Sequence, residues 1–138
     1  MVGKIPRKDE DRLSARIYLE KAHQSSAAMY LSFEEGLWNA AGENAVRCAI
    51  HSCDALTVAI GGVRSSSKNH EDAAKLLVEI VKGKDVKEMS NRYLGIIRMK
   101  NPVDYDPRLL RKKDAQKALN DTDTFLAWVE SRMPPGYR

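Results

Sequence analysis

The sequence predicts an all-α protein, an up-and-down bundle of four to five helices. Three observations support this fold class. Apolar residues recur every three or four positions along most of the chain, the spacing that puts them on one face of a helix. No segment alternates apolar and polar residues as a half-buried strand would. Glycine and proline fall between the periodic segments, where helices end.

Two long helices are expected in the first half of the chain, after a flexible tail over residues 1–8. Residues 9–33 carry one apolar stripe, typical of a helix with one buried face. Residues 37–60 carry two adjacent seams of mostly small side chains. Such a face indicates a central helix that its neighbours approach closely, and Gly61 and Gly62 end it.

Two short helices and one long helix are expected in the second half. The first short helix covers residues 69–81, with an asparagine as its N-cap. The second covers residues 86–98, and Pro102 interrupts the chain after it, because proline cannot donate a backbone hydrogen bond. The last helix begins within residues 107–114 and runs to a C-terminal tail, residues 134–138.

Length and composition fit a single domain over residues 9–133. The chain has 138 residues, of which 43% are apolar, enough for one core. It has no apolar stretch of membrane-spanning length and no apolar leader, so we expect a cytoplasmic protein without a membrane partner. Cys48 and Cys53 lie five positions apart, which turns them away from each other on a helix. We interpret both as small, reduced core residues.

Positive charge is concentrated in one part of the chain. The net charge is +4, but residues 92–113 hold seven cations and two acids, a local net charge of +5. The cations are Arg92, Arg98, Lys100, Arg108, Arg111, Lys112 and Lys113. This placement indicates a surface for an anionic partner.

Two histidine patterns allow a chemical interpretation and a plainer one. Glu20 and His23 have the spacing of a di-iron bundle motif, but the second pair that such a site needs is missing. We interpret them as a surface pair and expect neither a metal nor a cofactor. Arg47 and His51, four positions apart, could act together on a phosphate. The alternative is that they flank the apolar seams, with the arginine head group in water.

Four segments, taken in their order and spacing, are similar to a known family. They are residues 45–56 of the small-residue helix, residues 70–77 after a serine-rich loop, residues 98–105, and residues 121–129 of the last helix. Together they resemble a HEPN domain (higher eukaryotes and prokaryotes nucleotide-binding) over about residues 9–133. The resemblance implies a helical bundle that pairs as a homodimer, with the motif arginines meeting across the interface.

Many members of that family are metal-independent ribonucleases, and the resemblance assigns their motif to residues 98–105. The motif is an arginine, four to six further residues, a histidine, and often a tyrosine two positions on; Arg98 and Tyr105 match it, and Val103 occupies the histidine position. Valine cannot transfer a proton, and losing one general acid or base typically costs ~10² to 10⁴ in rate. The resemblance therefore implies at most residual ribonuclease activity.

What remains is a basic surface that suits phosphates, with a tyrosine that could stack on a base. Its expected binding residues are Arg98, Lys100, Tyr105, Arg108, Arg111, Lys112 and Lys113. The main hypothesis is a HEPN-like domain that binds nucleotide or RNA without ribonuclease activity. As the resemblance implies, it could be the partner of a nucleotidyltransferase in a toxin–antitoxin-like pair.

Two alternatives stay open. The chain could be an active ribonuclease with a rearranged site, if the bundle brings His51 near Arg98. It could also be a dimeric protein-interaction module whose charges only solvate the last helices. The large side chains Trp38, Tyr93 and Trp128 are compatible with a dimer interface.

Overall fold

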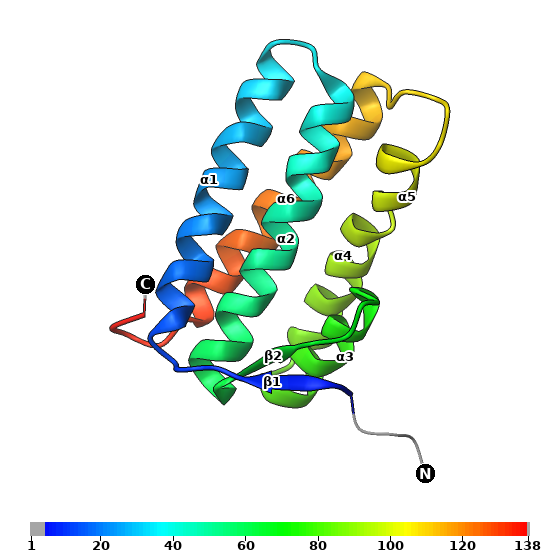
Figure 1. Ribbon diagram of the computed structural model, residues 1–138. Helices are drawn as coiled ribbons and strands as arrows, with labels where there is room; N and C mark the ends of the chain where they lie inside the picture. Colours follow the sequence, from blue (N-terminus) through cyan, green and yellow to red (C-terminus); the bar gives the residue numbers. More distant parts are fainter. Residues whose placement is uncertain (1–4, 138) are drawn as a thin grey trace.

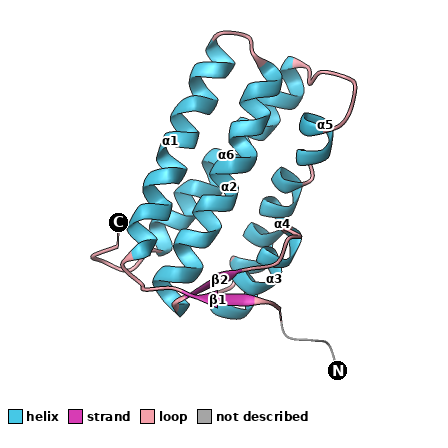
Figure 2. Ribbon diagram, viewed as in Figure 1, coloured by secondary structure: helices cyan, strands magenta, loops and turns pink. Residues whose placement is uncertain are grey.

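The computed structural model describes residues 5–137, and three long helices form its framework (Figure 1). They are α1 (Ser14–Glu34), α2 (Trp38–Gly61) and α6 (Lys112–Arg132). α2 packs against both others, and three shorter helices lie along its remaining side (Figure 2). These are α3 (Glu71–Ile80), α4 (Val86–Ile97) and α5 (Lys100–Asp104). The arrangement confirms the predicted all-α bundle. Within residues 5–137 no helix is long and apolar enough to cross a membrane.

α2 is the central helix, as the seams of small residues predicted. Its buried residues are Ala41, Gly42, Ala45, Val46, Cys48, Ala49, Ser52, Cys53, Ala55, Leu56, Thr57, Val58 and Ala59. At Gly42 an added Cβ would lie 2.5 Å from Cδ1 of Leu110. The missing side chain therefore lets the segment after α5 pack directly on α2.

Both cysteines are buried and unbridged, which agrees with their predicted role as reduced core residues. Burial raises the pKa of the Cys48 thiol to about 12. This thiol is protonated at neutral pH and is not a nucleophile.

A short antiparallel sheet is the first difference from the sequence prediction. β1 (Arg7–Asp9) pairs with β2 (Val63–Ser65), and Lys8 lies opposite Arg64. Two strands of three residues are too short to show an alternating pattern. The tail expected over residues 1–8 thus includes a strand at Arg7 and Lys8; residues 1–4 lie outside the described residues.

The expected interruption at Pro102 is the second difference. Asn101 and Pro102 lie inside α5, and only Arg98 and Met99 separate α4 from α5. Pro102 occupies the first turn of α5, where a backbone N–H has no acceptor within the helix, so its missing donor costs little. The irregular stretch comes later, over residues 105–111.

The aromatic residues considered for a dimer interface belong mostly to the core of a single chain. Tyr93 is fully buried and Trp128 is 7% exposed. Both pack on Phe125, at ring-centroid distances of 5.5 and 5.8 Å. Their size is therefore explained by the fold and does not indicate dimerisation; Trp38 is half-buried against Phe33.

Candidate nucleic-acid interface

The end of α4 and the start of α5 face the start of α3 across a cavity of about 450 Å³. We call it the α3–α5 cleft; its lining residues are Lys68, Asn69, His70, Glu71, Ile97, Arg98, Lys100, Asn101 and Tyr105. Asn69 lines one wall, and its side-chain Oδ1 accepts a hydrogen bond from the backbone N–H of Glu71 at 2.9 Å. The N-cap of α3 is His70, one position after the asparagine that the sequence predicted. The cleft brings together three of the predicted binding residues: Arg98, Lys100 and Tyr105.

These three side chains are accessible and only loosely paired. Arg98 is exposed, and its Nε donates to Oε1 of Glu71 at 3.0 Å. Lys100 donates to Asp104 at 3.0 Å, and its Nζ lies 5.5 Å from the centre of the Tyr105 ring. Tyr105 is 73% exposed. The cleft thus offers two cations and an open aromatic face.

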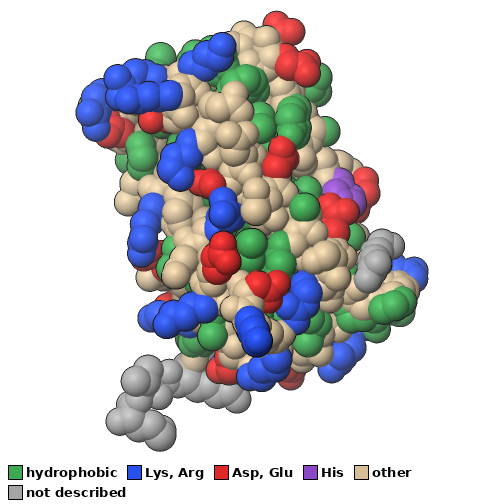
Figure 3. All heavy atoms as spheres, turned by 180° about the vertical axis from the view of Figure 1, so that it is seen from behind, with side chains coloured by type: hydrophobic (Ala, Val, Ile, Leu, Met, Phe, Trp, Pro, Cys, Tyr) green, Lys and Arg blue, Asp and Glu red, His purple; other side chains and the backbone are tan. Residues whose placement is uncertain are grey.

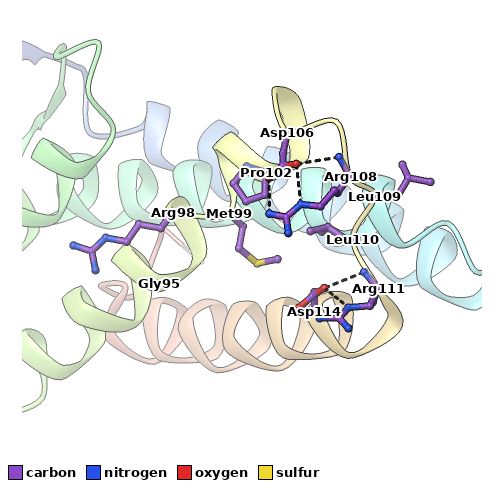
Figure 4. Close-up of a pocket in the computed structure, with 10 residues that line it drawn as sticks. All are labelled: Gly95, Arg98, Met99, Pro102, Asp106, Arg108, Leu109, Leu110, Arg111 and Asp114. Carbon is purple, nitrogen blue, oxygen red and sulfur yellow. Dashed lines mark hydrogen bonds and ion pairs between the residues drawn. The ribbon is translucent and has the colours of Figure 1, made fainter.

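A second, larger cavity of about 660 Å³ lies between α4–α5 and the start of α6 (Figure 4). Arg108 forms two hydrogen bonds with the carboxylate of Asp106, at 3.1 and 3.0 Å. Arg111 is the N-cap of α6 and bonds to Asp114 through its backbone N–H at 2.9 Å. Arg98 also lines this cavity, but Figure 4 shows its guanidinium pointing away, toward α3. Arg108 is therefore more fully paired than Arg98, whereas the guanidinium of Arg111 has only an ion pair with Asp114 at 3.9 Å.

The remaining predicted cations lie at the start of α6. Lys112 has its Nζ 6.0 Å from the centre of the Trp38 ring, and Lys113 is exposed. Figure 3 shows Lys and Arg side chains gathered over the loop before α6 and the beginning of that helix. The predicted set is thus spread over two cavities and a helix terminus, and the cleft holds three of its seven members.

Val103, at the histidine position of the motif, does not face the cleft. It is 8% exposed, and its Cγ2 would lie 3.2 Å from a Cβ at Gly42. Its carbonyl oxygen accepts a hydrogen bond from Nδ2 of Asn39 at 3.0 Å. Val103 therefore packs against α2, and no described cavity is lined by both Val103 and Arg98.

The histidine that lies beside Arg98 is His70, which the sequence analysis did not select. His51 lines a different cavity, and Arg47 lines a third, small one together with Val103. Burial, and then the charge of Lys100, lowers the pKa of His70, so its imidazole is neutral at pH 7. Only the path of the serine-rich loop between α2 and α3 brings His70 to the cleft, and no motif spacing predicts that contact.

His23 makes an ordinary surface contact. Its Nε2 lies 3.4 Å from Oε1 of Glu130 on α6, and both side chains are exposed. Its partner is thus on another helix and is not Glu20.

The fold and this cleft define a class of protein, a helical bundle with a basic surface cleft that holds an exposed aromatic side chain. A family model described as the HEPN domain matches residues 15–132. The chain therefore belongs to the HEPN domain family, a family of nucleotide- and RNA-related domains, as the resemblance indicated. No curated protein matches the chain.

Proposed function

We propose that this HEPN domain binds RNA or a nucleotide in the α3–α5 cleft and lacks efficient ribonuclease activity. The observation that carries the proposal is the position of Tyr105, 73% exposed and in one cleft with Arg98 and Lys100. An exposed aromatic ring beside cations is the combination with which proteins stack bases and hold the phosphates between them.

The ion pairs that hold the cations of the cleft are weak enough for a phosphate to replace the carboxylates. Glu71 and Asp104 hold Arg98 and Lys100 through contacts at the surface. Surface pairs of this kind contribute little to stability. A phosphate can therefore replace either carboxylate, and the arginine can offer it two parallel N–H donors.

Fluorescence anisotropy with a labelled single-stranded RNA of about ten nucleotides tests the proposal, since that length spans a typical binding groove. We expect binding that weakens as salt rises. Arg98→Ala removes one phosphate contact, so the negative slope of log K against log salt should become shallower by about 0.7. Tyr105→Ala should weaken binding by about 1–3 kcal/mol through lost stacking. Lys117→Ala is the matched control, because Lys117 is an exposed cation on α6 that pairs with Asp121 and lines none of the described cavities. No binding at low salt, or equal affinity in all four proteins, would contradict the proposal.

One observation supports a second candidate, a ribonuclease with a rearranged site. His70, neutral at pH 7, lines the cleft together with Arg98 and could accept a proton from a ribose hydroxyl. RNA cleavage in the presence of EDTA that is lost in His70→Ala and kept in His51→Ala would support it; loss in His51→Ala would instead favour the site predicted from sequence. Val103→His should not create activity, because that side chain packs on α2.

We also propose a partnership with a nucleotidyltransferase, as in a toxin–antitoxin-like pair, with family membership as its support. A nucleotidyltransferase gene next to this one, and co-purification of the two products, would support it. Co-purification with an unrelated protein that is indifferent to Arg98→Ala, in a chain that binds no RNA, would favour the protein-interaction module.

A further inference from the structure

The loop that follows Tyr105 has little structure of its own. Residues 105–111 join α5 to α6 without a helix or strand. Tyr105 and Leu109 are 73% and 80% exposed, and Figure 1 shows the loop arching out beyond α5 before it returns to α6. The position of the Tyr105 ring therefore depends on the contacts that hold this part of the chain on the bundle.

Asn39, in the first turn of α2, bonds to both ends of the stretch that contains Tyr105. Its Nδ2 donates to the carbonyl oxygen of Val103 at 3.0 Å, and its Oδ1 accepts a hydrogen bond from the backbone N–H of Leu110 at 3.4 Å. A side-chain amide offers a donor and an acceptor side by side and carries no charge. We call residues 103–110 the tyrosine segment. One side chain of α2 thus holds both of its ends.

Gly42 accommodates the side chains of the same two residues. It lies one helical turn after Asn39, on the same face of α2. An added Cβ would lie 2.5 Å from Cδ1 of Leu110 and 3.2 Å from Cγ2 of Val103. Glycine is a poor helix former, so the close approach of the tyrosine segment explains why a glycine stands in this helix. We call Asn39 and Gly42 the α2 socket.

Outside the socket, α5 and the loop after it are attached to α2 more loosely. A cavity of about 180 Å³ lies between side chains of α2 and α5. The ion pairs of this region, Lys100 with Asp104 and Arg108 with Asp106, lie within α5 or within the loop. Among the described residues, both hydrogen bonds that join residues 98–111 to α2 are those of Asn39. The socket is therefore the polar attachment of this part of the chain to α2.

We propose that Asn39 and Gly42 are positioning residues, which dock the tyrosine segment on α2 and so place the Tyr105 ring in the α3–α5 cleft. The main hydrophobic core includes neither Val103 nor Leu110. Loss of the socket should therefore release the segment and leave the bundle folded. The ring would then no longer be held beside the cations of the cleft. The effect on RNA binding rests on the proposed function, whereas the docking of the segment does not.

Hydrogen exchange of the full chain, followed residue by residue by NMR, tests the docking. Asn39→Leu removes both hydrogen bonds at similar side-chain size, and Gly42→Ala places a methyl group against Leu110. In each variant the hydrogen-bonded amides of the tyrosine segment should exchange at least roughly tenfold faster, with unchanged rates in the middle of α1 and α6. Asn44→Leu is the matched control and should change neither, because Asn44 donates to the carbonyl oxygen of Ala40 within α2.

Affinity for the labelled single-stranded RNA tests the role of the socket. Asn39→Leu should weaken binding as much as Tyr105→Ala does. Adding Asn39→Leu to Tyr105→Ala should change the affinity by no more than about twofold, because the socket acts through that ring. Losses that add in the double variant would overturn the proposal. So would unchanged exchange of the tyrosine segment in both socket variants, or equally fast exchange in Asn44→Leu. If wild type binds no RNA, the proposed function fails and the exchange rates alone decide the docking.

Discussion

Two residues of the motif differ sharply in solvent exposure although they are close in the sequence. Val103 is 8% exposed against α2, and Tyr105, two positions later, is 73% exposed in the cleft. Val103 lies within α5 and faces α2, whereas Tyr105 follows the last residue of α5, where the chain leaves the helix. A valine suits the buried position, since it fills the space above Gly42 without a polar atom. Position 103 is therefore explained by packing, and the chemistry of the cleft depends on its neighbours.

Asp54 should make the stability of the protein depend on pH. Burial raises the pKa of this carboxyl group from the ordinary value of 3.8 to about 7 in the folded chain, although the charge of Arg64 acts in the opposite direction. Between these two values the folded state binds more protons than the unfolded state, so the free energy of unfolding falls as pH rises, and the loss is complete above about 7. Asp54→Asn should therefore be more stable than wild type at pH 8 by roughly 1–3 kcal/mol, with little difference at pH 4.

Urea unfolding at both pH values measures this effect. The difference between variant and wild type isolates Asp54, because His51 and His70 titrate in both proteins. Asp9→Asn, an exposed aspartate on β1, is the control and should show no such difference. An Asp54→Asn protein less stable than wild type at pH 8 would show that the carboxylate is satisfied after all.

At the scale of helices and strands, the periodic sequence patterns predicted the long helices correctly but did not predict the shortest elements. α1, α2 and α6 have 21, 24 and 21 residues, long enough for their periodic stripes to be read. β1, β2 and α5 have three, three and five residues. Tertiary contacts hold these pieces, such as the pairing of β1 with β2 and the hydrogen bond from Asn39 to Val103.

Substitution by alanine should change the stability of the protein in opposite directions at two glycines. Gly62 ends α2 with φ +67°, a left-handed conformation that turns the chain into β2. Gly62→Ala should destabilise the protein by about 1 kcal/mol. Gly95 lies within α4, where an added Cβ would meet nothing within 4 Å. Gly95→Ala should stabilise it by about 0.5–1 kcal/mol. Thermal unfolding compares the two variants; a shift of the same sign for both would contradict this assignment.

At the scale of the whole molecule, the question is whether two copies of the chain form a homodimer. The family resemblance implies a homodimer in which the arginines of the motif meet, and we propose that state for this chain. Leu109 is 80% exposed in the loop between α5 and α6, which follows the motif, so we expect a dimer that joins the two motif segments to cover it. The buried Tyr93 and Trp128 make no contribution to such an interface.

Light scattering after size-exclusion chromatography measures the mass of the assembly. We expect twice the mass of a 15.5 kDa chain for wild type, and a shift toward the monomer for Leu109→Glu. Leu13→Glu, on a 59% exposed leucine before α1, is the matched control and should remain dimeric. A monomeric wild type would remove the dimer from the proposal and leave the cleft unaffected.

The sequence by itself determined the fold class, the central small-residue helix, the buried cysteines and the family. These features depend on patterns within one helix or on motif order, and both can be read along the chain. It also selected Arg98, Lys100 and Tyr105, which lie together because they belong to one short stretch. Only the tertiary structure brought His70 to Arg98, separated His51 from that cleft, and buried Asp54 far enough to raise its pKa. Those contacts join segments far apart in the sequence, and their geometry depends on how the helices pack, which no local pattern records.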